Sequence, residues 1–277
     1  MKNVLLFLRC ALLLALGAAS GCGKNSSVGN VPLSPAVASG ESPRPLRYSY
    51  EVIKKWPHDP GAFTQGLVFH HGEFLESTGL NGRSTLRGVD IPSGRILHRK
   101  SLSPEFFAEG LTVIGTKAYQ LTWKGRKGFI YDVDTFDVQG EFVYDGEGWG
   151  LTTDGKSLVL SDGTNRIRFI DPVSFAVTRT IEVTLSGQPV DRLNELEWIK
   201  GEIFANVWQT ETVVRIDPGA GAVRGVIDFS GILPREERGP ETDVMNGIAY
   251  DPASDKLYVT GKCWPAVFEV RLKAVAN

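Results

Sequence analysis

The chain has 277 residues, of which 42% are hydrophobic and 22% are charged, the profile of an ordinary globular protein. Its net charge of -2 and isoelectric point near 6.1 exclude the strongly basic surface that is typical of proteins binding nucleic acid or anionic membranes.

The first 21 residues predict an export signal rather than part of the fold. Lys2 and Arg9 flank and interrupt the apolar run VLLFLRCALLLALGAAS, and small residues lead up to Cys22. The ending ASGC resembles a bacterial lipobox, in which Cys22 is lipidated; plain cleavage near Ala19 is the alternative. A membrane-spanning helix is disfavoured, because Arg9 leaves about a dozen uninterrupted apolar residues where about 20 are needed. We therefore expect an exported protein, either periplasmic, anchored to the outer membrane through its lipid, or secreted.

Residues 23–45 are rich in Ser, Gly and Pro and lack apolar periodicity, which predicts a flexible tether. The expected organisation is a signal at 1–21, a tether at 22–46 and a single domain at 47–277. If Cys22 is lipidated, Cys263 has no partner in the mature chain, so no disulfide framework is expected.

Five similar segments recur along the predicted domain: FTQGLVF, AEGLTVI, GWGLTTD, LNELEWI and MNGIAYD. Matching positions in them, the anchor positions, are separated by 44, 40, 45 and 52 residues and hold Gln65, Glu109, Trp149, Asn194 and Asn246. These intervals are typical of propeller blades with four strands each. In the second repeat, β-branched runs bounded by turn residues predict strands near 108–114, 117–122, 128–133 and 137–143. The sequence therefore predicts an all-β fold, a five-bladed β-propeller.

The two ends of the predicted domain complement each other. The fifth repeat supplies GIAYD, KLYVT and AVFEVRL and then lacks a fourth strand, whereas RYSYEVIKKW precedes the first repeat. We predict that residues 47–55 pair with a strand at 266–272 and close the last blade, which removes an exposed edge.

The anchor positions predict a binding site. The first strand of a propeller blade lies innermost, so the anchor side chains should converge on the axis; the alternative is a polar channel wall that only contacts water. Among the anchors only Glu109 ionises, and Phe106 or Phe107 should press against it. Apolar surroundings raise the pKa of a carboxyl and suit it to proton transfer near neutral pH. A solvated channel glutamate is the alternative.

Large or cationic residues follow three of the predicted second strands, where turns usually carry small polar residues. They should lie at the same end of the propeller channel as the residues that precede the first strands. Together these residues should form an aromatic pocket for a small polar side chain. The residues are Trp123, Trp208 and Lys262, together with Phe63, Phe107 and Trp149. Packing of Trp123 and Trp208 between blades is the alternative.

No metal or cofactor site is expected from the sequence. The four histidines, His58, His70, His71 and His98, lie outside the anchor positions, and no HxH, HExxH or CxxC spacing occurs. There is no GxSxG motif and no Gly-rich phosphate loop.

Motifs spread over all five repeats resemble one family. HDPGAFTQGL, ESTGLNGRS, AEGLT, GWGLT, LNELEW, ANVW and TGKCWP are similar to motifs of the plant-type glutaminyl-peptide cyclotransferases, the papaya-latex glutaminyl cyclase family, which has bacterial members. The similarity runs from about residue 48 to 272. It implies a five-bladed propeller, unrelated to the zinc-dependent animal enzymes, that converts N-terminal glutamine of peptides and proteins to pyroglutamate with loss of ammonia. A monomer that does not bind nucleic acid is expected.

The resemblance also implies roles for individual residues. The family's essential glutamate falls on Glu109, and its other site residues fall on Phe63, Phe107, Trp123, Trp149, Trp208, Gln65, Asn194 and Lys262. Asn81 stands where the family usually has an aromatic residue, and Cys263 where a bulkier residue is common.

Two other functions remain open. A non-catalytic scaffold of the cell envelope would need neither Glu109 nor Lys262. A calcium-dependent, lactonase-like propeller would need several convergent carboxylates, whereas the anchors supply one.

Overall fold

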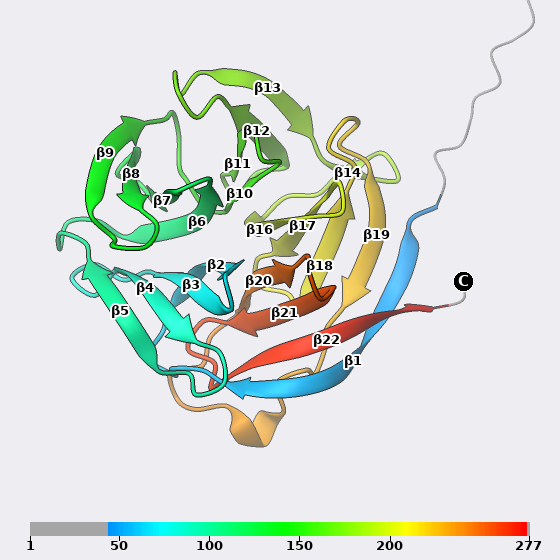
Figure 1. Ribbon diagram of the computed structural model, residues 1–277. Coiled ribbons are helices and arrows are strands. Elements are labelled where there is room, and N and C mark those ends of the chain that lie inside the picture. The colour runs from blue at the N-terminus through cyan, green and yellow to red at the C-terminus, as the bar shows by residue number, and fades with distance from the viewer. Residues whose placement is uncertain (1–43, 276–277) are drawn as a thin grey trace, which may run out of the picture. The chain divides into compact units, whose positions relative to one another are not determined.

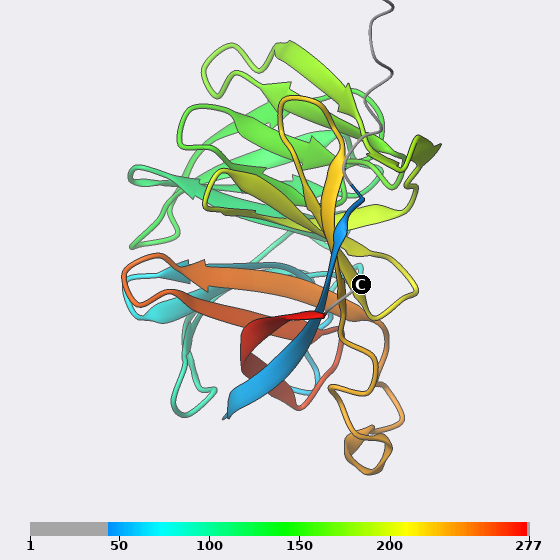
Figure 2. The same ribbon diagram turned by 90° about the vertical axis from the view of Figure 1, so that its right-hand side faces the viewer.

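The computed structural model describes residues 44–275, and these residues form an all-β structure with one short 3₁₀ helix, Arg235–Glu237 (Figures 1 and 2). The predicted all-β class is confirmed. The predicted signal, nearly all of the tether and the lipidation site at Cys22 lie outside the described residues and stay predictions. Within the described part of the chain, no helix is long and apolar enough to cross a membrane.

Three four-stranded antiparallel sheets follow each other along the chain. The first contains β2 (Thr64–His70), β3 (Glu73–Thr78), β4 (Thr85–Asp90) and β5 (Ile96–Ser101). The second contains β6 (Ala108–Ile114), β7 (Lys117–Thr122), β8 (Lys127–Asp132) and β9 (Val138–Val143). The third contains β10 (Leu151–Thr153), β11 (Leu158–Ser161), β12 (Arg166–Ile170) and β13 (Val177–Glu182). The strands of the second sheet agree with the predicted ones to within one residue.

The rest of the described chain forms an eight-stranded sheet and a small hairpin. In spatial order the large sheet contains β16 (Leu193–Ile199), β17 (Glu202–Val207), β18 (Thr212–Ile216), β19 (Val223–Asp228), β1 (Leu46–Pro57), β22 (Ala266–Val275), β21 (Lys256–Gly261) and β20 (Met245–Asp251). The hairpin consists of β14 (Thr184–Leu185) and β15 (Gln188–Pro189).

Strand β1 joins the first and last described parts of the chain. It pairs antiparallel with β22 from Arg47↔Val275 to Pro57↔Ala266, so the predicted pairing is confirmed (Figure 1). It also pairs in parallel with β19, beginning at Leu46↔Gly225, which the sequence did not predict. Both long edges of β1 are therefore used, and the edges of β19 and β22 are covered.

Turn chemistry explains why the strands reverse where they do. Two-residue loops join β2 to β3 and β16 to β17, and both residues of each loop have positive φ, as a type I′ turn requires. In the second of these loops φ is 51° at Lys200 and 84° at Gly201. Between β12 and β13, the Asp171 carboxylate accepts the backbone N–H groups of Val173 and Ser174 at 3.1 and 2.7 Å.

The first strands of the sheets pack closely around a centre. β2 contacts β6, β6 contacts β10, β10 contacts β16, β16 contacts β20, and β20 contacts β2, which closes a cycle. Glycine after the anchor makes this approach possible: a Cβ atom on Gly110 would lie 2.4 Å from the Leu151 nitrogen, and one on Gly150 would lie 1.9 Å from the Asn194 carbonyl oxygen. The repeated small residue is therefore a packing requirement.

The apolar core is divided among the gaps between neighbouring sheets. In one cluster Leu75 and Leu86 of the first sheet pack with Leu111 and Tyr131 of the second, and all four are buried. Four further clusters fill the other gaps in the same way. Because full burial of such a side chain stabilises a fold by about 1.5–3 kcal/mol, these gaps hold the sheets together and leave the centre to polar residues.

Candidate active site

The anchor side chains are positioned by irregularities in the first strands. Pairing with the second strand shifts register between residues 64 and 66, 108 and 111, 193 and 196, and 245 and 248. Such β-bulges add an unpaired residue and re-aim its side chain. The anchors in these bulges are buried, with exposed fractions of 3% for Gln65, 5% for Glu109, 2% for Asn194 and 0% for Asn246.

Two of the anchors touch. The Asn246 side-chain N–H donates to the Thr64 carbonyl at 3.0 Å and to Gln65 Oε1 at 3.4 Å. Because Gln65 accepts through its oxygen, its own NH₂ group remains available as a donor. Three buried amide atoms have no partner among the described residues: Asn194 Oδ1, Asn206 Nδ2 and Asn246 Oδ1. Since buried polar atoms are normally satisfied, these atoms mark a place for a polar ligand or water.

The predicted aromatic residues are half-buried and form an arc of contacts at one end of the first strands. Phe63 lies edge-on to Phe107 at 6.0 Å between ring centroids, and Phe107 lies 5.7 Å from Trp123. Trp149 lies edge-on to Trp208 at 5.5 Å. We call these five residues the aromatic arc. The predicted pocket residues thus gather in two groups of ring contacts, and Trp123 and Trp208 each contact another member of the arc.

Lys262 lies at one end of this arc. Its Nζ is 4.8 Å from the centroid of the Phe63 ring, and only 5% of the residue is exposed. The segment that carries Phe63 is fastened to the turn after Lys262: Cys263 N donates to the Ala62 carbonyl at 2.7 Å. His58 adds a second link, with Nδ1 2.7 Å from the Trp264 carbonyl oxygen. These two hydrogen bonds to backbone carbonyls therefore hold the segments that carry Lys262 and Phe63 next to each other.

The surroundings of Glu109 shift the proton affinity of its carboxyl. Burial raises the pKa of Glu109 well above its usual value; the Lys262 ammonium opposes this rise and the Glu147 carboxylate adds to it. Burial also lowers the pKa of Lys262, although the carboxylates of Glu109 and Asp243 oppose that change. Desolvation by burial is the largest cause of the rise in the pKa of Glu109.

Comparison with known proteins identifies the family of the chain. The glutamine cyclotransferase family model matches residues 27–272. The chain belongs to the glutamine cyclotransferase family. An Arabidopsis thaliana protein named glutaminyl-peptide cyclotransferase is 42% identical over 229 residues, which make up 80% of this chain and 71% of that protein. The crystal structure of Myxococcus xanthus glutaminyl cyclase, also 42% identical, covers 84% of this chain and 100% of its own, with a TM-score of 0.79. The resemblance and the predicted enzyme class, a transferase, are confirmed.

Sequence reasoning missed two polar residues near the centre of this glutamine cyclotransferase. Glu195 occupies the position that is glycine in the other repeats and is 1% exposed; its carboxylate accepts the N–H of Ile248 at 2.9 Å and of Leu67 at 3.3 Å. Asn206 Oδ1 accepts the N–H of Gly247 at 3.0 Å. The sequence feature that could have identified Glu195 is its departure from the glycine of the repeat. For Asn206, that feature is its position two residues before Trp208.

A third missed residue, Glu147, lies within the arc of this cyclotransferase. Its Oε2 accepts the indole N–H groups of Trp123 at 2.7 Å and of Trp149 at 3.0 Å. It precedes the anchor Trp149 by two residues, outside any predicted strand, so neither periodicity nor the anchor pattern singled it out.

Asn81 and Cys263, which the resemblance marked as departures from the family's usual residues, make no hydrogen bond or ion pair with Glu109 in residues 44–275. Asn81 is exposed, and its Nδ2 donates to the carbonyl oxygen of Glu105 at 3.0 Å. Cys263 is a buried free thiol, 7% exposed.

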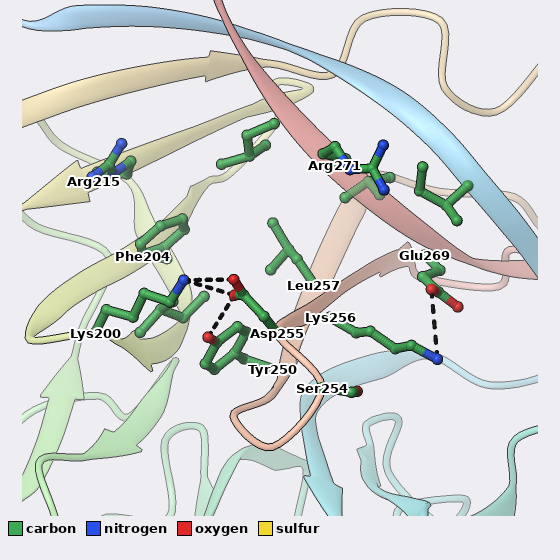
Figure 3. Close-up of a pocket in the computed structure, with 14 residues that line it drawn as sticks. Lys200, Phe204, Arg215, Tyr250, Ser254, Asp255, Lys256, Leu257, Glu269 and Arg271 are labelled. Atoms are coloured by element: carbon green, nitrogen blue, oxygen red, sulfur yellow. Dashed lines mark hydrogen bonds and ion pairs between the residues drawn. The ribbon is translucent and has the colours of Figure 1, made fainter.

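A pocket of about 530 Å³ lies elsewhere in the cyclotransferase, beside the turns that join β16 to β17 and β20 to β21 (Figure 3). Four of its charged groups are paired with each other: Lys200 Nζ lies 2.7 Å from Asp255, and Lys256 Nζ lies 3.7 Å from Glu269. Arg215 and Arg271 pair with Glu202 and Glu51 outside the lining. None of the predicted site residues lines it. In residues 44–275, no three His, Cys, Asp or Glu side chains are grouped so that they could hold a metal ion.

Proposed function

We propose that this chain converts the N-terminal glutamine of peptides and proteins to pyroglutamate and releases ammonia, with Glu109 as the proton shuttle. The α-amine nitrogen attacks the side-chain amide carbon, a C–N bond forms and closes a five-membered lactam, and the bond to the amide nitrogen breaks. Membership of the glutamine cyclotransferase family supports the reaction. The observation that supports the role of Glu109 is a buried carboxyl beside Lys262, next to the aromatic arc.

Glu109 moves one proton during the reaction. Its carboxylate accepts a proton from the attacking amine, which becomes a neutral amide nitrogen, and the carboxyl returns that proton to the departing NH₂ group as ammonia leaves. An acid with a raised pKa suits both directions, because general acid–base groups work best when their pKa lies near the operating pH. Burial supplies that rise for Glu109.

The developing oxyanion on the amide oxygen needs donors that are already in place. Lys262 supplies a buried ammonium, and Gln65 and Asn194 supply side-chain N–H groups. Gln65 is oriented for this role by the N–H of Asn246 on its oxygen. Preorganised donors stabilise charge that appears only in the transition state, and so they increase the turnover number.

The aromatic arc supplies the geometry of ring closure. Binding the glutamine side chain between aromatic faces holds it folded back toward its own α-amine, a near-attack conformation that lowers the barrier by proximity. The half-burial of Phe63, Phe107, Trp123, Trp149 and Trp208 leaves a face of the arc open to a peptide N-terminus.

We propose a five-bladed propeller as the architecture behind the site. Three blades are the four-stranded sheets, and the eight-stranded sheet is two blades joined where β19 meets β1. The last blade then takes β1 as its outermost strand beside β22, and the five first strands surround the axis in the observed cycle of contacts. A monomer is sufficient for this site, because every residue assigned to it comes from one chain. An experimental structure showing fewer than five separate blades would refute this architecture.

The test is an assay of ammonia release. Purified protein is mixed with a Gln-initiated dipeptide, and ammonia and the loss of the free amine are followed with and without a chelator. We expect one ammonia per lactam formed, and no ammonia from the same dipeptide with an acetylated N-terminus. A rate no higher than that of spontaneous cyclisation would refute the function.

A further inference from the structure

Glu147 joins the two halves of the aromatic arc. Phe63, Phe107 and Trp123 form one run of ring contacts, and Trp149 and Trp208 form the other. A single oxygen, Glu147 Oε2, accepts the indole N–H of Trp123 at 2.7 Å and that of Trp149 at 3.0 Å. Trp123 follows β7 of the second sheet and Trp149 precedes β10 of the third, so one carboxylate fastens walls that come from two sheets.

The backbone around Glu147 is held from both sides. The Arg168 guanidinium donates through Nη2 to the Glu147 carbonyl at 3.2 Å, and Gly148 N donates to the Trp123 carbonyl at 3.2 Å. Arg168 itself lies 3.6 Å from the Asp162 carboxylate. Because the loop is anchored in this way, the carboxylate is presented to the indoles from a fixed position rather than from a free loop.

The second oxygen of Glu147 is less engaged. Oε1 lies 3.9 Å from Lys124 Nζ, and 39% of the Glu147 side chain is exposed. One oxygen would be enough for a carboxylate whose sole role was to orient two indole groups. The charge of Glu147 is one of those that act on the Glu109 carboxyl, together with that of Lys262.

We propose that Glu147 is a positioning residue of the cyclisation reaction: it sets the spacing of Trp123 and Trp149 and places a negative charge beside Glu109. This inference rests on the proposed function. Two separable effects follow, one through hydrogen-bond geometry and one through charge.

The geometric effect acts on substrate binding. Without an acceptor between them, the indoles of Trp123 and Trp149 are no longer held by one group, and the distance between the two halves of the arc increases or becomes variable.

The charge effect acts on proton transfer. The groups whose charges act on the Glu109 carboxyl are Lys262 and Glu147, and Tyr144 interacts with it as well. The Glu147 carboxylate is paired with Lys124, whereas Arg168 contacts the Glu147 backbone carbonyl. Neutralising Glu147 leaves Lys262 as the dominant charge at Glu109, so Glu109 loses its proton at lower pH.

Two substitutions separate these effects. Glu147→Gln keeps a carbonyl oxygen that can accept both indole N–H groups but removes the charge, whereas Glu147→Ala removes both. Glu141→Gln is the matched control, because it neutralises a carboxylate that pairs with Lys127 at 2.8 Å on the outer strand β9. The variants are compared by kcat and KM across pH with a Gln-initiated dipeptide, by tryptophan emission and by thermal unfolding.

We expect Glu147→Gln to keep KM within about threefold and to move the acid limb of kcat/KM to lower pH. Glu147→Ala should raise KM by about tenfold or more, the range expected for losing a hydrogen bond to a charged group. It should also shift the tryptophan emission, while Glu147→Gln and Glu141→Gln leave it close to that of the unmodified protein. A KM that is retained in Glu147→Gln but raised in Glu147→Ala distinguishes a positioning role from a general loss of stability.

Two results would overturn the inference. Unchanged KM and emission in a folded Glu147→Ala protein would refute the geometric role, and an unshifted acid limb in Glu147→Gln would refute the electrostatic role. If the unmodified protein releases no ammonia from Gln peptides, the proposed function fails instead, and the emission spectra still test whether Glu147 orders the two indoles.

Discussion

Glu109 is buried in a place where its proton affinity depends on a few named neighbours. Desolvation raises its pKa, Lys262 lowers it, and Glu147 raises it again. A solvated glutamate in a channel would lack the first of these effects. The burial of Glu109 therefore favours the enzyme over an inert scaffold, and the single carboxylate among the anchors gives no support to a calcium cage.

Glu109→Gln should lower kcat by about 10²–10⁴-fold while the substrate still binds, because an amide keeps the size of the group but cannot shuttle a proton. Ammonia release measures kcat, and calorimetry measures binding. Glu105→Gln, in the loop before β6, is the matched control, since Glu105 is exposed and should leave turnover unchanged. Near-normal turnover in Glu109→Gln would remove the residue from its role.

The pH dependence of kcat/KM should be bell-shaped. Because Glu109 must be ionised to accept the amine proton and its pKa is raised, activity should fall with acid well above the usual glutamate range. Because Lys262 must be charged and its pKa is lowered, activity should fall with base below the usual lysine value. The profile is measured after correcting for the titration of the substrate amine. An acid limb at the pKa of an ordinary glutamate would contradict the assignment.

Lys262 and the tryptophans should separate in their kinetic effects. Lys262→Ala should lower kcat by about 10²–10³-fold, the usual loss for one donor to a developing oxyanion. Trp123→Ala or Trp208→Ala should act mainly on KM, because these rings hold the substrate before the charge develops. Steady-state kinetics on the Gln dipeptide measures both, with Lys156→Ala as the exposed lysine control. Unchanged kcat in Lys262→Ala would exclude its proposed role.

At the scale of single strands, the repeated pair of anchor and glycine has two physical purposes. The bulge turns the anchor side chain away from the strand pairing, and the glycine lets the next first strand approach. Glu195 shows what happens when a repeat departs from glycine. Its carboxylate reaches the N–H groups of Leu67 and Ile248 on two other first strands, so the departure adds a link across the centre.

Gly110→Ala should destabilise the fold by about 3 kcal/mol or more, the upper end of the cost of overpacking, because the added Cβ meets backbone that cannot rotate away. Gly115→Ala is the matched control: nothing lies within 4 Å of its added Cβ, and its cost of about 1–2 kcal/mol comes from a φ of +60°. Urea unfolding measures both free energies. Equal stabilities for the two variants would contradict the packing account of the glycine repeat.

At the scale of the whole molecule, β1 is the element that makes the described chain one unit. It lies between β19 and β22, and Tyr50 packs on Phe229 with ring centroids 5.4 Å apart. Its residues are far in sequence from both partners, so its pairing closes long loops and carries their entropic cost. The site depends on it, because Lys262 lies on the strand and turn that lead into β22.

A chain that begins at His58 should lack a cooperative thermal transition and show no activity. Removing a strand paired on both sides costs an amount comparable to the whole stability of a domain, about 5–15 kcal/mol. A chain that begins at Arg44 is the control and should keep its melting temperature and its turnover. Calorimetry and the ammonia assay distinguish the two, and a cooperative transition in the shorter chain would contradict closure by β1.

The sequence by itself determined the all-β class, the strands of the second repeat, the pairing of residues 47–55 with 266–272 and the group of residues at the site mouth. These follow from the local alternation of apolar and polar residues, from the turn residues, and from a sequence repeat whose matching positions lie at matching places in the structure. Tertiary structure alone decided that β1 also pairs with β19, that four of the five anchors lie in bulges, and that Glu147 joins Trp123 to Trp149. Each of these features depends on distances between separate strands or loops. Packing across the gaps between sheets sets such distances, and it produces no periodic pattern in the amino-acid sequence.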